Sequence, residues 1–527
     1  MRATQTAVAM REMWQRGHSW RGLVSGLAFY AGFVLLLSVV PHRWPIDPSV
    51  ASAASLDGYN NRIAHLVVVL WALVGVTGFA VGTRFGRFSP PDNAVLSDAR
   101  VTPAAPGTAG ARDAIEIVAV VAGALLFYFP PFLARYGPYI EDSFFLTILH
   151  RMQSGQRPYV DFQYVYGPLT IWPMYFWTKA FGFSMTSYYW SLVVLEALHL
   201  VVLLRLLQHH IPDCRTRYTV FLTIGAFQLN TLLGVNSNGL RRLLPVVAML
   251  LLARRPRAVG MAVTSSMILG VQLAYFPEYG VAALAAILAM YGLLTVLERD
   301  LAYVRLAAVA IGVAAAAWYT CSVLVLGADF PGYVKQTAYL IRRFDAGEQA
   351  FGFYWTVNAL ALFGLLCLGC IVIGRGLARP RDQMSAPGDR LLFCGLIYAL
   401  VALKSGLHRS DLWHLTAPFL GLVFTFLLPW RRALFGYSVA LQRVASLLVV
   451  VAAATYVFGL LPTASYYLSG LIRGLRDSVT VRAEAGRRSP MTRAPTIEVE
   501  RSYPSADILR LGEYLAQGSR AERPVLF

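Results

Sequence analysis

The stretch GLVSGLAFYAGFVLLLSVV, at residues 22–40, decides what kind of protein this chain forms. No charged residue interrupts it, and a helix that crosses the hydrocarbon core of a bilayer needs about 20 mostly apolar residues. Similar stretches recur along the chain, which is 57% hydrophobic and 14% charged and has a mean hydropathy of +0.54. A typical soluble domain is about 25% charged. The sequence therefore predicts an all-α polytopic membrane protein.

Apolar stretches of this kind predict about thirteen transmembrane helices. One further segment, PLTIWPMYFWTKAFGF at 168–183, is apolar and aromatic but short, and it contains Lys179 and two prolines. We expect it to lie along the membrane surface as an interfacial helix. The predicted spans are 22–40, 63–82, 114–133, 186–206, 218–235, 241–254, 258–274, 279–297, 304–326, 353–373, 391–405, 413–430 and 444–462.

The chain is strongly basic, with 46 Lys and Arg against 28 Asp and Glu and a formal net charge of +18. The cations lie mainly in short clusters between apolar stretches, which indicates membrane topology and argues against nucleic-acid binding. Short arginine-bearing loops, at 254–257, 375–390 and 431–432, belong to the cytoplasmic side by the positive-inside rule. The pattern predicts a multi-pass protein of the inner (plasma) membrane, with a cytoplasmic N-terminus and an extracytoplasmic C-terminus.

The spans and loops divide the chain into three parts. Residues 1–113 hold the first two spans and a Pro-, Gly- and Ala-rich cytoplasmic loop that we expect to be disordered. Residues 114–462 hold the other spans, with a long outer loop at 134–185. Residues 463–527 form a short extracytoplasmic tail, which has too few apolar residues for an independent core.

The long outer loop carries the most informative carboxylates. Glu141 and Asp142 follow directly after the third span, and Asp161 lies about twenty residues later. A carboxylate at this boundary could take a proton from a hydroxyl group, or hold a divalent cation over a phosphate. Glu141 and Asp142 could equally be acidic residues that the dipole of a helix N-terminus favours. Both interpretations stay open from these residues alone.

Five arginines in predicted outer loops are candidates for binding an anion such as a phosphate. Arginine in a short outer loop goes against the positive-inside rule, which hints at a function. Snorkelling of the side chain, or pairing with lipid headgroups, would explain the same residues. The candidates are Arg241 and Arg242 after VNSNGL, Arg342 and Arg343 in the loop at 329–355, and Arg409, with His408 beside it in HRSDLWH.

Three other residues could contact a substrate. Glu278 in AYFPEYG lies between two apolar runs, where a buried carboxylate is expensive, although a solvated turn would also accommodate it. Tyr159 and Tyr166 could belong to a sugar-stacking surface or to an ordinary aromatic belt at the membrane interface. The segment HRSDLWH has a spacing that can bind metal but lacks a clear further ligand for zinc.

The string YIEDSFFLTILHRMQSGQRPYVDFQYVYGPL, at 139–169, contains several spaced elements in a distinctive order. These are the acidic pair, a short helix, Gly155, P-Y-V-D at 158–161 and G-P-L at 167–169. The string resembles the first outer loop of the GT-C glycosyltransferase superfamily, which includes protein O-mannosyltransferases and lipid A aminoarabinose transferases. The multi-span layout is also similar, so the resemblance covers about residues 114–527 and leaves the first two spans as an addition.

This resemblance implies an enzyme that takes a sugar from a polyprenyl-phosphate donor on the extracytoplasmic side. The acceptor would be an envelope glycan, lipid or protein, and the enzyme would work within the lipid bilayer. A carboxylate of the outer loop would act as the general base; we favour Asp142 over Glu141, with Asp161 nearby. The five arginines would bind the donor phosphate. The resemblance implies no certain cofactor and leaves a divalent metal open.

Two other classes of protein fit the composition. A transporter or flippase of lipid-linked glycan predicts charged residues deep within spans and paired halves with broken helices. Few charges lie in the middle of the predicted spans, and the carboxylates gather in one outer loop, which favours the enzyme. The chain has no Walker motif for ATP-driven transport. A non-catalytic membrane protein is the third interpretation.

Overall fold

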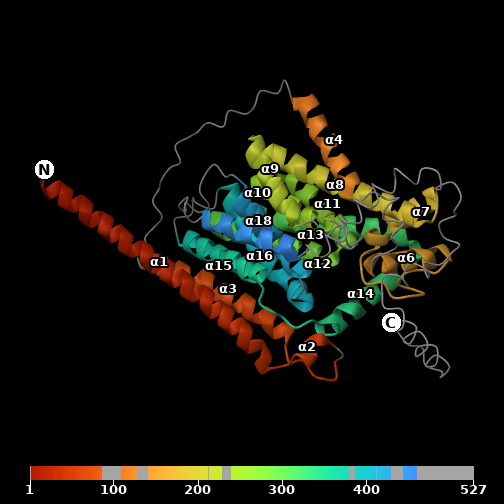
Figure 1. Cartoon of the computed structure of the whole chain (residues 1–527), viewed down its shortest axis with the longest axis horizontal. Helices are drawn as coiled ribbons and strands as arrows, with labels where there is room; N and C mark the ends of the chain where they lie inside the picture. The colour runs from red at the N-terminus through yellow and green to blue at the C-terminus, as the bar shows by residue number, and fades with distance from the viewer. Residues whose placement is uncertain are drawn as a thin grey trace.

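The protein forms a bundle of helices (Figure 1). The computed structural model describes residues 2–50, 52–85, 109–127, 140–211, 213–227, 239–378, 386–410, 412–428 and 443–459. Every regular element within these ranges is helical, and none is a strand. The all-α prediction is therefore confirmed for this part of the chain.

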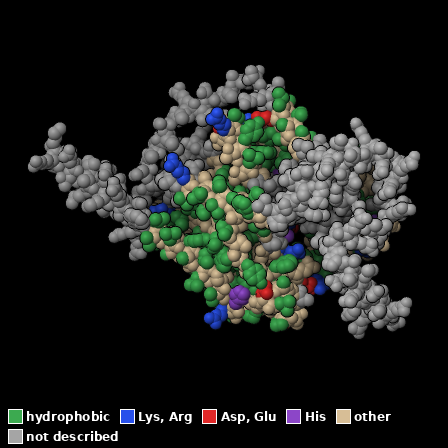
Figure 2. Space-filling model, viewed as in Figure 1, with side chains coloured by type: hydrophobic (Ala, Val, Ile, Leu, Met, Phe, Trp, Pro, Cys, Tyr) green, Lys and Arg blue, Asp and Glu red, His purple; other side chains and the backbone are tan. Residues whose placement is uncertain are grey.

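Seven helical stretches among the described residues are long and apolar enough to cross a membrane. The architecture is thus that of a multi-pass membrane protein, and Figure 2 shows hydrophobic side chains spread over the visible face, with charged ones mainly near its margins. The seven are the Gly22–Arg43 part of α1 (Arg2–Arg43), α3 (Asn61–Arg84), α8 (Met185–His210), α12 (Pro277–Glu298), the continuous stretch of α13 (Ala302–Leu326) and α14 (Phe330–Asp345), α15 (Val357–Leu377) and α16 (Pro387–Arg409).

The remaining predicted spans coincide with shorter helices, so the count of about thirteen stays a prediction. The predicted interfacial segment is also helical, as α7 (Pro168–Phe181). The predicted disordered loop and the C-terminal tail lie outside the described residues, apart from the ends of that loop. The shorter helices are α4 (Ala109–Phe127), α9 (Cys214–Ala226), α10 (Leu240–Arg254), α11 (Val259–Tyr275), α17 (Leu412–Thr416), α18 (Leu420–Leu427) and one at Arg443–Gly459.

Loops that the sequence assigns to the same compartment meet at the same end of the bundle. At one end, the Ala54 amide of α2 (Ala53–Leu56) donates to the Ala350 carbonyl, and the Phe351 amide donates to the His408 carbonyl. The helix α14 lies at this end, which we call the α14 end. At the other, the α9 end, Arg390 Nε donates to the Ala253 carbonyl at 2.7 Å. Each of these contacts joins segments that the predicted topology assigns to the same side of the membrane, and the orientation of the chain stays a prediction.

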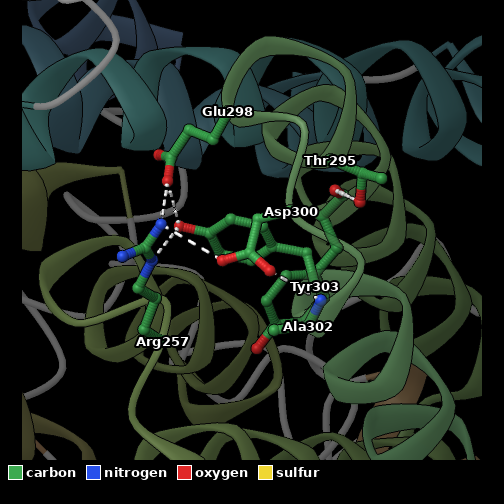
Figure 3. Close-up of polar contacts among 7 residues, drawn as sticks. Arg257, Thr295, Glu298, Asp300, Ala302 and Tyr303 are labelled. Atoms are coloured by element: carbon green, nitrogen blue, oxygen red, sulfur yellow. Dashed lines mark hydrogen bonds and ion pairs between the residues drawn. The ribbon is translucent and has the colours of Figure 1, made fainter.

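A polar clamp joins two helix turns at the α9 end (Figure 3). Arg257 precedes α11 and forms ion pairs with Glu298 and Asp300, with N···O distances of 2.7 and 3.2 Å. The Tyr303 hydroxyl donates to Glu298 Oε2 at 2.8 Å and accepts a hydrogen bond from Arg257 Nε at 3.0 Å. These contacts tie the α10–α11 turn to the turn between α12 and α13.

The first two spans belong to the same packed bundle. Helices α1 and α3 pack together through stacked rings of Phe29 and Trp71, whose centroids are 5.2 Å apart. The Tyr30 hydroxyl of α1 donates to the Leu360 carbonyl of α15 at 2.7 Å. Gly374 brings α15 against the α3 backbone, since a Cβ at this position would collide with the carbonyl oxygen of Val76.

Replacing Gly374 with alanine should therefore destabilise the protein by about 1–3 kcal/mol, because the added methyl group overpacks a backbone contact. Thermal unfolding of the detergent-solubilised full chain measures this effect. Gly78→Ala on α3 is the matched control, because no atom lies within 4 Å of a Cβ built there. Equal shifts in Tm for the two variants would contradict the packing assigned to Gly374.

Candidate functional site

The first turn of α10 carries two buried arginines. Arg241 and Arg242 are only 4% and 3% exposed, and a buried charge is costly unless it is paired. Arg241 Nη2 donates to Glu278 Oε1 at 3.0 Å. Its Cζ lies 4.1 Å from the ring centroid of Phe276 and 5.0 Å from that of Tyr279. Ion pairing and cation–π contacts thus compensate for the burial of Arg241.

Arg242 points to a different neighbour. Its Nη1 donates to the carbonyl of Phe227, the residue that follows α9, at 3.1 Å. Arg242 therefore ties the end of α9 to the start of α10, whereas Arg241 faces the start of α12. The intervening residues 228–238 lie outside the described part of the chain.

The junction between α11 and α12 forms the other side of the site. Gln272 Nε2 donates to the Arg241 carbonyl at 3.0 Å, and Thr170 Oγ1 of α7 donates to the Tyr275 carbonyl at 2.8 Å. Gly167 lies so close to the Ala274 and Tyr275 carbonyls that a Cβ there would collide with them. The G-P-L element follows from this contact: glycine permits the close approach, and proline begins α7 without needing an N–H partner.

A row of aromatic rings connects α6 (Ile140–Gln153) with Arg241. The ring of Phe145 lies 6.0 Å from that of Tyr166, and Tyr166 lies 5.5 Å from Phe276, which contacts Arg241. The first turn of α6 contains the predicted acidic pair, and a helix over these residues was expected. The side chains of the pair lie outside the described atoms, so the structure does not choose between a catalytic and a helix-dipole role for them.

Asp161 lies in an exposed turn where hydrogen bonds hold its carboxylate. The Arg157 amide donates to Asp161 Oδ2 at 2.7 Å, and Arg157 Nε lies 3.4 Å from the same oxygen. These contacts with Arg157, the backbone hydrogen bond above all, lower the pKa of Asp161. Arg157 also bonds Asp329 at 3.2 Å, so this carboxylate is part of a polar network that orders the loop.

Tyr159 is packed within the protein. Its ring is parallel to Trp172 at 6.0 Å and lies 4.9 Å from Tyr333 of α14. Its hydroxyl donates to the Tyr166 carbonyl at 2.6 Å, and burial raises the pKa of Tyr159 well above the ordinary value. The ring of Tyr159 packs against other side chains in a buried cluster, and Tyr166 is half-buried beside it. A substrate-binding role for either ring stays a prediction.

The other predicted cations form a separate group at the α14 end. Arg343 pairs with Glu348 and donates to the Tyr339 hydroxyl at 2.6 Å, while Arg342 is exposed beside it. The Arg409 Cζ lies 5.1 Å from the Phe351 ring, and the rings of His408 and Phe344 are 5.6 Å apart. Tyr333 is within electrostatic range of Glu278, but Arg343 lies about 15 Å farther along α14. The five arginines thus divide into two groups.

The described residues contain no group of three or more His, Cys, Asp or Glu side chains that could hold a metal ion. Asp411 of the HRSDLWH segment lies outside those residues. The structure therefore adds nothing to the sequence-based interpretation of this segment as a metal site.

Three contributors to the site were not found from the sequence. Glu196 and His199 of α8 are buried and hydrogen-bonded to each other, with 2.9 Å between Oε1 and Nδ1. Tyr398 of α16 is fully buried within electrostatic range of Arg241, and its hydroxyl has no hydrogen-bond partner among the described residues. Glu196 and His199 had a usable signal, because they interrupt an apolar span at helical spacing.

An apolar groove of about 550 Å³ has one of its lining residues on α10. It lies between α10, α11 and α13, and Leu244 on its wall is one helical turn from Arg241. Its other lining residues are Met267, Ile268, Val271, Val313, Ala316, Ala317, Thr320 and Cys321. A buried cation and an apolar groove are therefore neighbours on the same helix.

Comparison with known proteins yields no match among family models, curated proteins or solved structures. The resemblance of residues 139–169 to the GT-C loop therefore stays a prediction. The function of this chain is therefore inferred from the geometry around Arg241.

Removing the partner of Arg241 should destabilise the protein. Glu278→Ala is expected to cost about 1–3 kcal/mol, because a buried guanidinium loses a charge-assisted hydrogen bond, while Glu278→Gln keeps an acceptor oxygen and should cost less. Glu348→Ala is the control, since its partner Arg343 is 45% exposed and surface ion pairs contribute about 0–1 kcal/mol. Thermal unfolding in detergent compares the three. A Glu278→Ala loss no larger than that of Glu348→Ala would contradict this assignment.

Proposed function

We propose that this protein is a membrane glycosyltransferase that moves a sugar from a polyprenyl-phosphate donor to an envelope glycan, lipid or protein on the extracytoplasmic side. The observation that carries the proposal is the position of Arg241. This buried cation lies at a helix start, beside an apolar groove and next to the loop that bears Glu141 and Asp142.

The start of α10 suits the phosphate of such a donor. Helix N-termini favour anions, and a guanidinium can bind phosphate through two parallel hydrogen bonds. Glu278 neutralises Arg241 in the structure described here, and its side chain is 36% exposed. In the proposed reaction, Glu278 is the counter-ion that the donor phosphate replaces on Arg241.

The groove suits the hydrocarbon chain of the donor. A polyprenyl phosphate has one anionic end and a long apolar tail, and the two ends need environments of opposite polarity. Arg241 and Leu244 provide these two environments within one turn of α10. An anionic lipid bound in this way would present its phosphate toward the α6–α7 loop.

The proposed reaction is a single displacement at the anomeric carbon of the sugar. The acceptor oxygen forms a bond to that carbon while the bond to the phosphate oxygen breaks, and the electron pair leaves with the phosphate. Asp142 takes the hydroxyl proton, and Arg241 stabilises the charge that builds on the phosphate. The configuration at the anomeric carbon is inverted. The atoms and charges balance without a further reactant.

Asp142→Asn is expected to abolish transfer, because the amide cannot accept the proton. Mass spectrometry of polyprenyl-linked sugars and envelope glycans, in cells that lack the chain and carry each variant at matched membrane levels, measures the outcome. We expect a monophosphate-linked sugar to accumulate and one glycan substituent to be missing, as in the deletion strain. Asp47→Asn, an exposed carboxylate change between the first two spans, is the control.

A wild-type profile in the Asp142→Asn strain would remove the assigned base. Glu141→Gln, tested in the same cells, then decides whether its neighbour takes that role. If neither variant changes the profile, the transferase proposal fails.

The flippase alternative has one observation in its favour. Buried Glu196 and His199 lie within the span α8, and charged groups inside spans mark the pathways of many transporters. A flippase would move labelled polyprenyl phosphate between the leaflets of a liposome without consuming a sugar donor. The transferase would consume the donor only when an acceptor is present.

Filling the groove provides a second test of the lipid-donor proposal. Ala316→Phe should raise the KM for a long-chain donor about tenfold or more, because displaced methylene groups lose burial worth about 0.8 kcal/mol each. The KM for a short-chain donor should hardly change. Ala315→Phe is the matched control, since Ala315 adjoins Ala316 but does not line the groove. An unchanged KM for the long-chain donor would exclude the groove as its site.

A further inference from the structure

An ionisable pair is buried inside the span α8. Glu196 Oε1 accepts a hydrogen bond from His199 Nδ1 at 2.9 Å, and the two side chains are 7% and 0% exposed. The pair lies about 16–21 Å along the helix from Met185, near the middle of this 26-residue apolar span. Ionisable groups at such a depth are expensive and are retained for a specific task.

The imidazole of this pair supports the start of α10. Gly239 is the N-cap residue of α10, and a Cβ at this position would collide with the His199 ring. The Gly239 carbonyl accepts the first hydrogen bonds of the helix, from the amides of Arg242 and Leu243, at 3.0 Å each. The orientation of the ring therefore limits where the first turn of α10, including Arg241, can lie.

A residue of a third helix, α11, lies close to the same groups. Tyr275, near the end of α11, is within electrostatic range of both Glu196 and Arg241. Its hydroxyl and the second carboxylate oxygen of Glu196 are buried and have no hydrogen-bond partner among the residues described. Groups from α8, α10 and α11 thus meet around the turn that bears Arg241.

We propose that Glu196 and His199 form a positioning pair for Arg241. The Glu196 carboxylate fixes the orientation of the His199 ring, and the ring in turn fixes the first turn of α10. The guanidinium is then held in place for an anionic lipid phosphate. This inference rests on the proposed function for its ligand, but the positioning of α10 can be tested without that ligand.

Amide hydrogen exchange of the full chain in lipid nanodiscs tests the positioning itself. His199→Ala should speed exchange at residues 239–246 about tenfold, because the helix start opens more often without the ring. Glu196→Gln keeps the His199 ring and an acceptor oxygen for it, so its exchange should stay within about threefold of the wild type. The control is His65→Ala on α3, where the His65 ring bonds the Leu400 carbonyl instead. Unchanged exchange at residues 239–246 in His199→Ala would overturn the proposal.

A double-mutant cycle tests whether the pair acts through Arg241. With polyprenyl phosphate as the probe, Glu196→Ala and His199→Ala should each weaken binding about tenfold, while Glu196→Gln restores it because an acceptor oxygen remains. In the Arg241→Ala background, His199→Ala should cause no further loss. An equal loss in both backgrounds would overturn the proposal. If the wild type does not bind polyprenyl phosphate, the proposed function fails, and the exchange experiment still decides the positioning role.

Discussion

The ion pair between Arg241 and Glu278 is the interaction on which the candidate site depends. Arg241 is buried within an apolar bundle, and such a charge is tolerated only with a partner. The pair joins the start of α10 to the start of α12, two helices that are distant in sequence. Because Phe276 and Tyr279 also contact the guanidinium, the α11–α12 junction has to lie where it does. The position of the segment from α6 to α7 follows from that junction.

The loop at 140–181 is fixed by contacts that hydrophobic packing alone would not specify. Gly167 permits the approach to the α11–α12 junction, and Thr170 adds a hydrogen bond to Tyr275. Tyr159, Tyr164 and Tyr166 then fill the space between α6, α7 and α14. This docking connects α6, whose first turn holds the proposed general base, to Arg241 through the rings of Phe145, Tyr166 and Phe276. A reaction between two substrates needs this kind of mutual orientation.

The candidate site combines a cationic and an apolar environment, which the anionic lipid of the proposed function would need. Arg241 is the cationic end, and the groove that begins near Leu244 is the apolar end. An enzyme that uses a lipid-linked sugar and a protein that moves such a lipid would share this feature, so the difference between them lies in the loop carboxylates. The buried pair in α8 fits either function, because its contact with Gly239 supports the start of α10 whichever function the protein has.

The sequence by itself determined the all-helical membrane architecture, because long apolar stretches and arginine-bearing loops are local features. It also located Arg241, Glu278 and the helix that starts at Glu141 and Asp142. Only the tertiary structure decided that Arg241 pairs with Glu278, since partners 37 residues apart in sequence leave no local pattern. The stacking of Tyr159 on Trp172 and the contact of the His199 ring with Gly239 likewise arise from the packing of segments that are separate in the sequence. The burial of a side chain and its contacts with other helices depend on how the helices pack, so the sequence of a single span does not show them.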